Sequence, residues 1–211
     1  MDGSMSYCQK AYGFKRSNAT GDDADQKNGL ALLSLESMTR DGSCGGVLEC
    51  HCLYTVEVRS VSVAVPGLAV GDRISFCTPC GGGTGVPSTL SPSTLLIGES
   101  NRATVPMGSS ECRAMTVPEG TTTTWFFGFW YIGEAGLDDA STASFYDPLL
   151  NDDVDPVALT WDEFQEVWSG LSDLPEVLLQ GDPPNDVFES WRGECESRLE
   201  AVAGIPPSTC E

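Results

Sequence analysis

Histidine is nearly missing from this sequence: His51 is the only one among 211 residues. Sites that need two or more histidines, such as a two-histidine zinc site, are therefore excluded. Basic residues are also few, with 11 lysines and arginines against 31 acidic residues and a formal net charge of -20. Nucleic acids and anionic membrane surfaces are bound by clustered Lys and Arg, so we expect neither as a partner.

Long apolar runs and enzyme motifs are missing as well. The longest apolar run, residues 125–132, is far shorter than the ~18 residues that cross a bilayer, so no membrane span is expected. The sequence contains no G-x-S-x-G nucleophile motif and no Walker-type phosphate loop. A catalytic pair of carboxylates cannot be singled out among so many acidic residues. We therefore predict a protein without enzymatic activity.

The acidic residues are distributed unevenly along the chain. Residues 1–133 contain 12 acidic and 9 basic residues, whereas residues 134–211 contain 19 acidic residues and only Arg192 and Arg198 as basic ones. Such an abrupt change in charge marks an organisational boundary. The sequence predicts a β-rich domain over residues 1–133 and an acidic helical extension over residues 134–211.

Upstream of this boundary, segments rich in Val, Ile and Thr alternate with Gly- and Pro-rich connections. The predicted strands cover residues 30–38, 54–63, 71–76, 94–99 and 125–132. Five strands with such connections are typical of a small barrel or sandwich. In the second strand, the alternation of Val56 and Val58 with polar residues breaks at Ser60, which predicts a β-bulge or a switch of face there.

Downstream of the boundary, apolar residues recur at helical spacing. Thr160 and Glu163 form a capping-box pair that starts the first predicted helix, and Asp186 and Glu189 form a similar pair for the second. The apolar faces of the two helices consist of Trp161, Phe164, Trp168 and Leu171, and of Phe188, Trp191, Cys195, Leu199 and Val202. Both faces are expected to pack against the β-rich part.

Cysteines are numerous and spread along the whole chain. The nine are Cys8, Cys44, Cys50, Cys52, Cys77, Cys80, Cys112, Cys195 and Cys210. In an oxidising compartment such a set forms a disulfide framework, and all nine are candidates for it. Asn18 begins an Asn-Ala-Thr sequon, which makes it a candidate glycosylation site. Both features predict a secreted protein or a protein of an organelle lumen.

Residues 54–119 contain an ordered series of strand, turn and cysteine features. In chain order they are Val56, Val58 and Val61, then Gly71-Asp72, Cys80-Gly81, Leu95-Leu96-Ile97-Gly98 and Cys112-Arg113. This order resembles the netrin-like module, which tissue inhibitors of metalloproteinases share with many secreted proteins. The resemblance implies a five-stranded OB-like β-barrel pinned by disulfides to an N-terminal cysteine segment. It further implies that Cys80 and Cys112 each pair with an upstream cysteine, Cys8 being one candidate.

The resemblance does not extend to metalloproteinase inhibition. Those inhibitors chelate the protease zinc through a free N-terminal Cys-x-Cys, whereas Cys8 is preceded by seven residues and followed by Gln9-Lys10-Ala11. The expected fold is thus α+β, a netrin-like five-stranded OB-like barrel with an acidic C-terminal helical segment packed on it.

Zinc binding is one alternative interpretation of the central cysteines. Cys50, Cys52, Cys77 and Cys80 together offer the four thiolates of a structural zinc site. Disulfides explain the same residues and are preferred here, since Cys-x-Cys is a poor zinc-binding turn.

Calcium binding is an alternative interpretation of the acidic stretch before the first predicted helix. Asp152, Asp153, Asp155 and Glu163 could form a weak, irregular Ca²⁺ site. An EF-hand loop is not present, because Val157 stands where that loop needs glycine. A capped helix that follows an acidic loop explains the same residues.

Aromatic residues are concentrated in the last predicted strand, where six of the eighteen lie within residues 125–131. If they are exposed, Trp125, Phe127 and Trp130 would form a platform for a sugar or a protein partner. If they are buried, the strand would instead lie between the barrel and the helices. The function that we predict is binding or structural, through contacts with a protein partner, with the acidic segment favouring a basic surface or divalent cations.

Overall fold

The computed structural model covers residues 1–211 and describes residues 3–20, 28–40, 50–80, 90–102, 115–123, 125–134, 144–146, 159–179 and 185–207. The strands are β1 (Gly29–Arg40), β2 (Cys50–Val63), β3 (Arg73–Cys80), β4 (Leu95–Arg102), β5 (Trp125–Glu134) and β6 (Ser144–Tyr146). The helices are α1 (Gly3–Thr20), α3 (Trp161–Gly170), α4 (Glu176–Leu179) and α5 (Asn185–Ala203). The predicted α+β class is confirmed.

The strands form one antiparallel sheet in the order β3-β2-β1-β4-β5-β6. Each of the five strands expected from the sequence is present, and β6 is an additional strand. Leu32 pairs with Ser60 and Leu33 with Val58, so Arg59 is the extra residue of a bulge. The break expected at Ser60 is therefore confirmed as a β-bulge, which lies at the neighbouring residue.

The sheet curls so that β3, at one end of the strand order, approaches the segment before β5. An isolated parallel bridge joins Ile74 to Thr122. Its backbone hydrogen bonds run from Ser75 N to Thr122 O (2.9 Å) and from Thr122 N to Arg73 O (3.0 Å). Beside it, the Ser75 hydroxyl lies 3.0 Å from that of Thr55 and 2.9 Å from that of Thr121. These contacts hold β3 against the segment before β5, although Thr122 itself lies outside β5.

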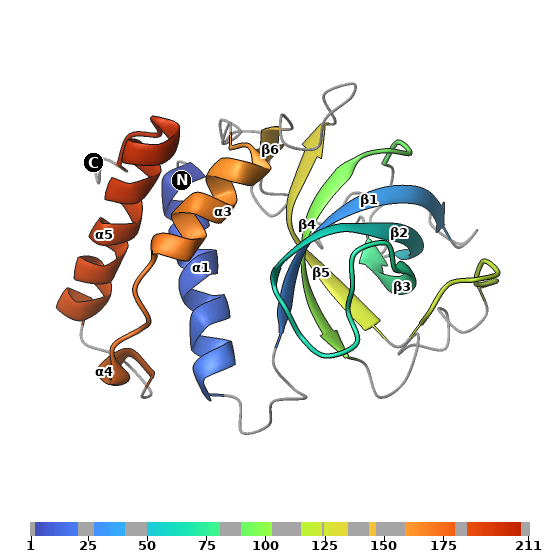
Figure 1. The fold of residues 1–211 in the computed structure, drawn as a ribbon, viewed down its shortest axis with the longest axis horizontal. Helices are drawn as coiled ribbons and strands as arrows, with labels where there is room; N and C mark the ends of the chain where they lie inside the picture. Colours follow the sequence, from blue (N-terminus) through green and yellow to red (C-terminus); the bar gives the residue numbers. More distant parts are fainter. Residues whose placement is uncertain are drawn as a thin grey trace.

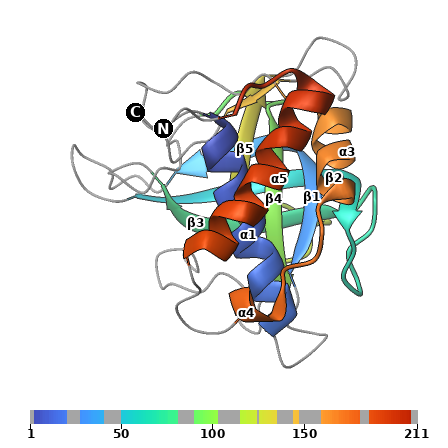
Figure 2. The same cartoon turned by 90° about the vertical axis from the view of Figure 1, so that its left-hand side faces the viewer.

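Helices cover one side of the curved sheet, as the two views show (Figure 1, Figure 2). Two hydrophobic cores follow from this arrangement, because β1 and β4 are buried on both faces. Leu33 and Leu96 belong to the core inside the curved sheet. Leu32 and Ile97 belong to the second core, which lies between the sheet and the helices.

The second core contains the helical apolar faces expected from the sequence. Its largest side chains are Tyr7, Phe14, Trp161, Phe164, Trp168 and Trp191. The Thr160 capping box is present, with the Thr160 hydroxyl accepting a hydrogen bond from Glu163 N. The second predicted cap is wrong in position: α5 begins at Asn185, which places Asp186 within its first turn.

The helix α1 lies with the acidic helices, although it comes from the other side of the predicted boundary at residue 133. Four residues of α1 share one core with α3, α5 and strand residues that include Leu30 and Leu95. The division into two domains stays a prediction. In the described part of the chain, no helix is both long and apolar enough to cross a membrane.

Candidate functional site

The helical layer is defined here as α1, α3, α4, α5 and the segment 171–175. Tyr7, Ala11 and Phe14 recur at helical spacing on the buried face of α1. Residues 3–20 contain Lys10, Lys15 and Arg16 but no acidic residue. A basic helix is thus packed among acidic ones. Part of the negative charge of the acidic segment is therefore balanced by α1 of the same chain.

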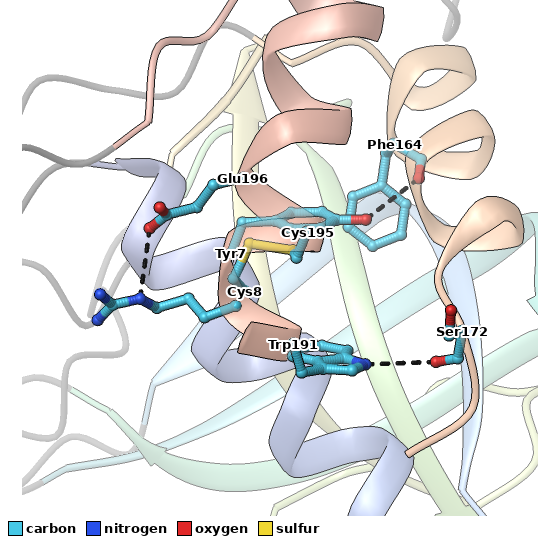
Figure 3. Close-up of a disulfide and its surroundings, with 8 residues drawn as sticks. Tyr7, Cys8, Phe164, Ser172, Trp191, Cys195 and Glu196 are labelled. Atoms are coloured by element: carbon cyan, nitrogen blue, oxygen red, sulfur yellow. Dashed lines mark hydrogen bonds and ion pairs between the residues drawn. A yellow bond between two sulfur atoms is a disulfide. The ribbon is translucent and has the colours of Figure 1, made fainter. Parts of the chain in front are cut away.

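A disulfide joins α1 to α5 at the centre of this layer (Figure 3). Cys8 and Cys195 have an S–S distance of 2.03 Å and a Cα–Cα distance of 5.9 Å, and both are fully buried. Beside the disulfide, the Tyr7 hydroxyl donates a hydrogen bond to the Phe164 carbonyl (3.3 Å). Burial raises the pKa of Tyr7 far above its ordinary value, because the phenolate would be desolvated. The layer is therefore cross-linked both covalently and by buried polar contacts.

Further contacts tie α5 to the segment that follows α3. The Trp191 indole donates a hydrogen bond to the Ser172 carbonyl (3.4 Å), as Figure 3 shows. The Ser172 hydroxyl donates to Glu194 (2.6 Å). These bonds hold residues 171–175 against α5.

A second disulfide joins Cys52 to Cys80 across β2 and β3, with a Cα–Cα distance of 5.9 Å. Cys77 is disulfide-bonded too. The four-cysteine zinc site is therefore not supported, because bonded sulfurs are not thiolate ligands. Cys50 is the first residue of β2, and its side chain lies outside the described part of the structure.

The pairing of Cys8 corrects one expectation that came from the netrin-like resemblance. Cys8 was a candidate partner of Cys80 or Cys112, but it bonds to Cys195, 187 residues further along the chain. Cys80 does bond to an upstream cysteine, Cys52. The remaining cysteines of the predicted framework, Cys44, Cys112 and Cys210, lie outside the described residues.

Of the four candidate calcium ligands, only Glu163 lies in a described segment. Its carboxylate accepts hydrogen bonds from Thr160 N (2.9 Å) and from the Thr160 hydroxyl (2.9 Å). Glu163 therefore has a structural role as a helix cap. Asp152, Asp153 and Asp155 lie outside the described residues, and within the described ones no group of three or more His, Cys, Asp or Glu is placed to hold a metal ion.

The aromatic candidates lie on β5, and the sequon lies at the end of α1. Trp125, Phe127 and Trp130 lie on β5, which is paired with β4 on one side and with β6 on the other; their side chains are outside the described part. Asn18 lies in the last turn of α1, where its Nδ2 donates a hydrogen bond to Asn28 O (3.1 Å). The Asn18 Oδ1 accepts one from Asn28 N (2.9 Å). The atom that glycosylation would modify thus helps to fasten the end of α1 to the start of β1.

Exposed carboxylates cover the outer surface of the helical layer. Those with exposed side chains are Asp162, Glu166, Asp173, Glu176, Asp186, Glu189, Glu194 and Glu200. We call this set the acidic surface. Arg192, one of the two arginines of α5, has a side chain only 13% exposed and lies against Glu189 and Glu196. Its positive charge is therefore largely neutralised by carboxylates of the same helix.

No family model, curated protein or solved structure matches this chain.

Proposed function

We propose that this chain is a secreted or lumenal binding protein without enzymatic activity, in which a netrin-like, OB-like barrel supports the helical layer. In this proposal, the acidic surface of the layer binds a protein partner through a basic surface on that partner. The observation that carries the proposal is the excess of exposed carboxylates on the helical layer. Arg192 does not offset this excess on the surface, because it is already paired with Glu189 and Glu196.

The strand neighbours support the OB-like part of the proposal. β1 lies between β2 and β4, β3 follows β2, and β5 follows β4. The parallel bridge between Ile74 and Thr122 brings β3 close to the chain that enters β5. The OB-fold is a partly open five-stranded barrel, and in this proposal the bridge is the contact that brings the two ends of that barrel together. Under this proposal, β6 is an addition to the barrel.

The disulfides support the proposed compartment. Cys8–Cys195 and Cys52–Cys80 would be reduced in the cytosol, whereas an extracellular or lumenal environment preserves them. Their presence is compatible with secretion or with residence in an organelle lumen.

Electrostatic complementarity gives the proposed interaction its properties. Charges at the rim of an interface mainly increase the association rate, and salt weakens their effect. We therefore expect binding that declines as the ionic strength rises. Divalent cations are a second kind of ligand for such a surface, and adding Ca²⁺ would compete with a basic partner.

The test compares two triple variants that remove the same charge. Glu166, Glu176 and Glu200 are exposed residues of three helices, and E166Q/E176Q/E200Q neutralises part of the acidic surface. The control E36Q/E57Q/E119Q removes the same formal charge on the side of the strands, where Glu36 and Glu57 form ion pairs with Arg73 and Arg59. Immobilised wild type and both variants are exposed to the extracellular protein fraction of the source cells and eluted with a salt gradient.

We expect the wild type and the control variant to capture a basic protein that elutes with salt. The helical variant should capture several-fold less of that protein, or none. Capture that is indifferent to salt, or equal loss on both variants, would contradict the proposed surface. Peptide mapping after alkylation without reductant, on protein isolated from its own cells, checks the compartment separately, since free thiols at Cys8 and Cys195 would contradict it.

A further inference from the structure

A cavity of about 480 Å³ lies at one end of the helical layer, between the C-terminal half of α1, the end of α3 and the segment that leads into α4. Its volume is within the range of small-molecule sites, roughly 300–1,000 Å³. Apolar side chains form most of its wall, including Phe14, Trp168, Leu174 and Leu179. Phe14 meets Trp168 edge to face, with ring centroids 5.2 Å apart.

One cationic group, the ammonium of Lys15, lines this apolar wall. The Lys15 side chain is only 15% exposed. Its Nζ lies 5.6 Å from the centroid of the Trp168 ring and donates a hydrogen bond to the Leu171 carbonyl (3.1 Å). An ammonium has three N–H donors, and a largely buried one is costly unless its charge is balanced.

The carboxylate that faces Lys15 in this structure is a weak partner. Asp173 Oδ1 is 3.7 Å from Lys15 Nζ, and the Asp173 side chain is fully exposed to solvent. Ion pairs with an exposed partner contribute little, since solvent screens them and the side chain loses freedom on pairing. Another carboxylate that approaches from within the cavity would therefore displace Asp173 at small cost.

We propose that this cavity binds a small amphipathic carboxylate, of the class of medium-chain fatty acids. The apolar part of the ligand lies against Phe14, Trp168, Leu174 and Leu179, and its carboxylate accepts a hydrogen bond from Lys15. The net charge of the protein does not prevent this, because α1 carries three basic and no acidic residues and distant charges are screened at physiological salt. Asp173 belongs both to this site and to the acidic surface, but Glu166, Glu176 and Glu200 do not line the cavity, so the triple variant that tests partner binding leaves the ligand site intact.

Isothermal titration calorimetry with octanoate tests the proposal, with 1-octanol as the uncharged comparison. We expect saturable 1:1 binding of octanoate to the wild type, tighter than the binding of 1-octanol. Lys15→Met keeps the unbranched apolar part of the side chain and removes the charged terminal group, so the affinity for octanoate should fall about tenfold or more while that for 1-octanol is preserved. Asp173→Asn removes the competing carboxylate and should strengthen octanoate binding.

Two further variants separate this site from unspecific effects. Lys10→Met makes the same charge change on the same helix but away from the cavity lining, and it should alter octanoate affinity less than Lys15→Met does. Leu179→Trp fills the cavity and should weaken both ligands. The proposal is overturned if octanoate does not saturate, if 1-octanol binds as tightly, or if Lys10→Met and Lys15→Met weaken octanoate equally. Should Lys15→Met not fold, Asp173→Asn and Leu179→Trp decide: opposite changes support the site, and no change in either rejects it.

Discussion

Removing the disulfide between α1 and α5 tests how strongly the helical layer depends on its covalent link. In the double variant Cys8→Ala/Cys195→Ala, two small apolar side chains replace two fully buried sulfurs. The main change is thus the loss of the cross-link, since no charge or unpaired polar group is introduced. The matched control is Cys52→Ala/Cys80→Ala, which removes the disulfide within the sheet.

The magnitude follows from the lengths of the two loops. Cys8 and Cys195 are 187 residues apart, and Cys52 and Cys80 are 28 residues apart. In the chain-entropy model, closing loops of these lengths stabilises the folded state by about 5 and about 3.5 kcal/mol, which are upper values. We therefore expect the longer loop to contribute roughly 1.5 kcal/mol more than the shorter one.

Urea unfolding of the wild type and the two double variants, followed by far-ultraviolet circular dichroism, measures both effects. The free energy of unfolding should fall in both variants, and further in Cys8→Ala/Cys195→Ala. A loss below about 1 kcal/mol in that variant, with an unchanged slope against urea, would refute the view that this disulfide stabilises the whole fold. Equal losses in the two variants would show that loop length does not set the magnitude.

Three further predictions concern single residues. Thr160→Ala removes the helix cap and should lower the free energy of unfolding by about 1 kcal/mol in urea titrations; an unchanged midpoint would show that the cap is dispensable. Gly29→Ala should destabilise the protein by roughly 1–3 kcal/mol, because an added Cβ would lie 2.7 Å from the Ser100 hydroxyl; a wild-type melting temperature would contradict this close packing. The raised pKa of Tyr7 means that its phenol stays protonated in the folded state while it ionises in the unfolded chain above a pH of about 10, so stability should decline above that pH. Tyr7→Phe loses the hydrogen bond to Phe164 but should flatten this alkaline decline, and an unaltered pH profile of unfolding would count against it.

The local parts of the fold were predictable because their signals are local. Segments rich in strand-forming residues between Gly- and Pro-rich connections predict all five main strands, and the Thr160 capping box predicts the start of α3 correctly. The helix α1 was missed, although Tyr7, Ala11 and Phe14 recur at the spacing of a buried helical face. That signal is short and interrupted by glycine and polar residues, so it is visible mainly once its packing partners are known.

The candidate sites depend on contacts that no local pattern carries. Lys15 and Trp168 are far apart in the chain, and α1 and α3 have to pack together before their side chains form a cavity wall. Likewise, nine cysteines allow many pairings, and sequence alone does not select Cys8 with Cys195. The abundance of exposed acidic residues was predictable from composition, whereas the basic helix packed among them was not.

The pairing of Cys8 with Cys195 also has a consequence for biosynthesis. Ribosomes add roughly 5–20 residues per second, so the 187 residues between the two cysteines take roughly 10–40 s to synthesise. During that time the Cys8 thiol has no native partner, while the cysteines of the strands emerge one after another. Cys52 and Cys80 can pair soon after they appear, but α1 cannot be fastened until nearly all the helical layer has been made. In the oxidising compartment proposed above, a thiol–disulfide isomerase that frees Cys8 from premature pairings should therefore speed the maturation of this chain.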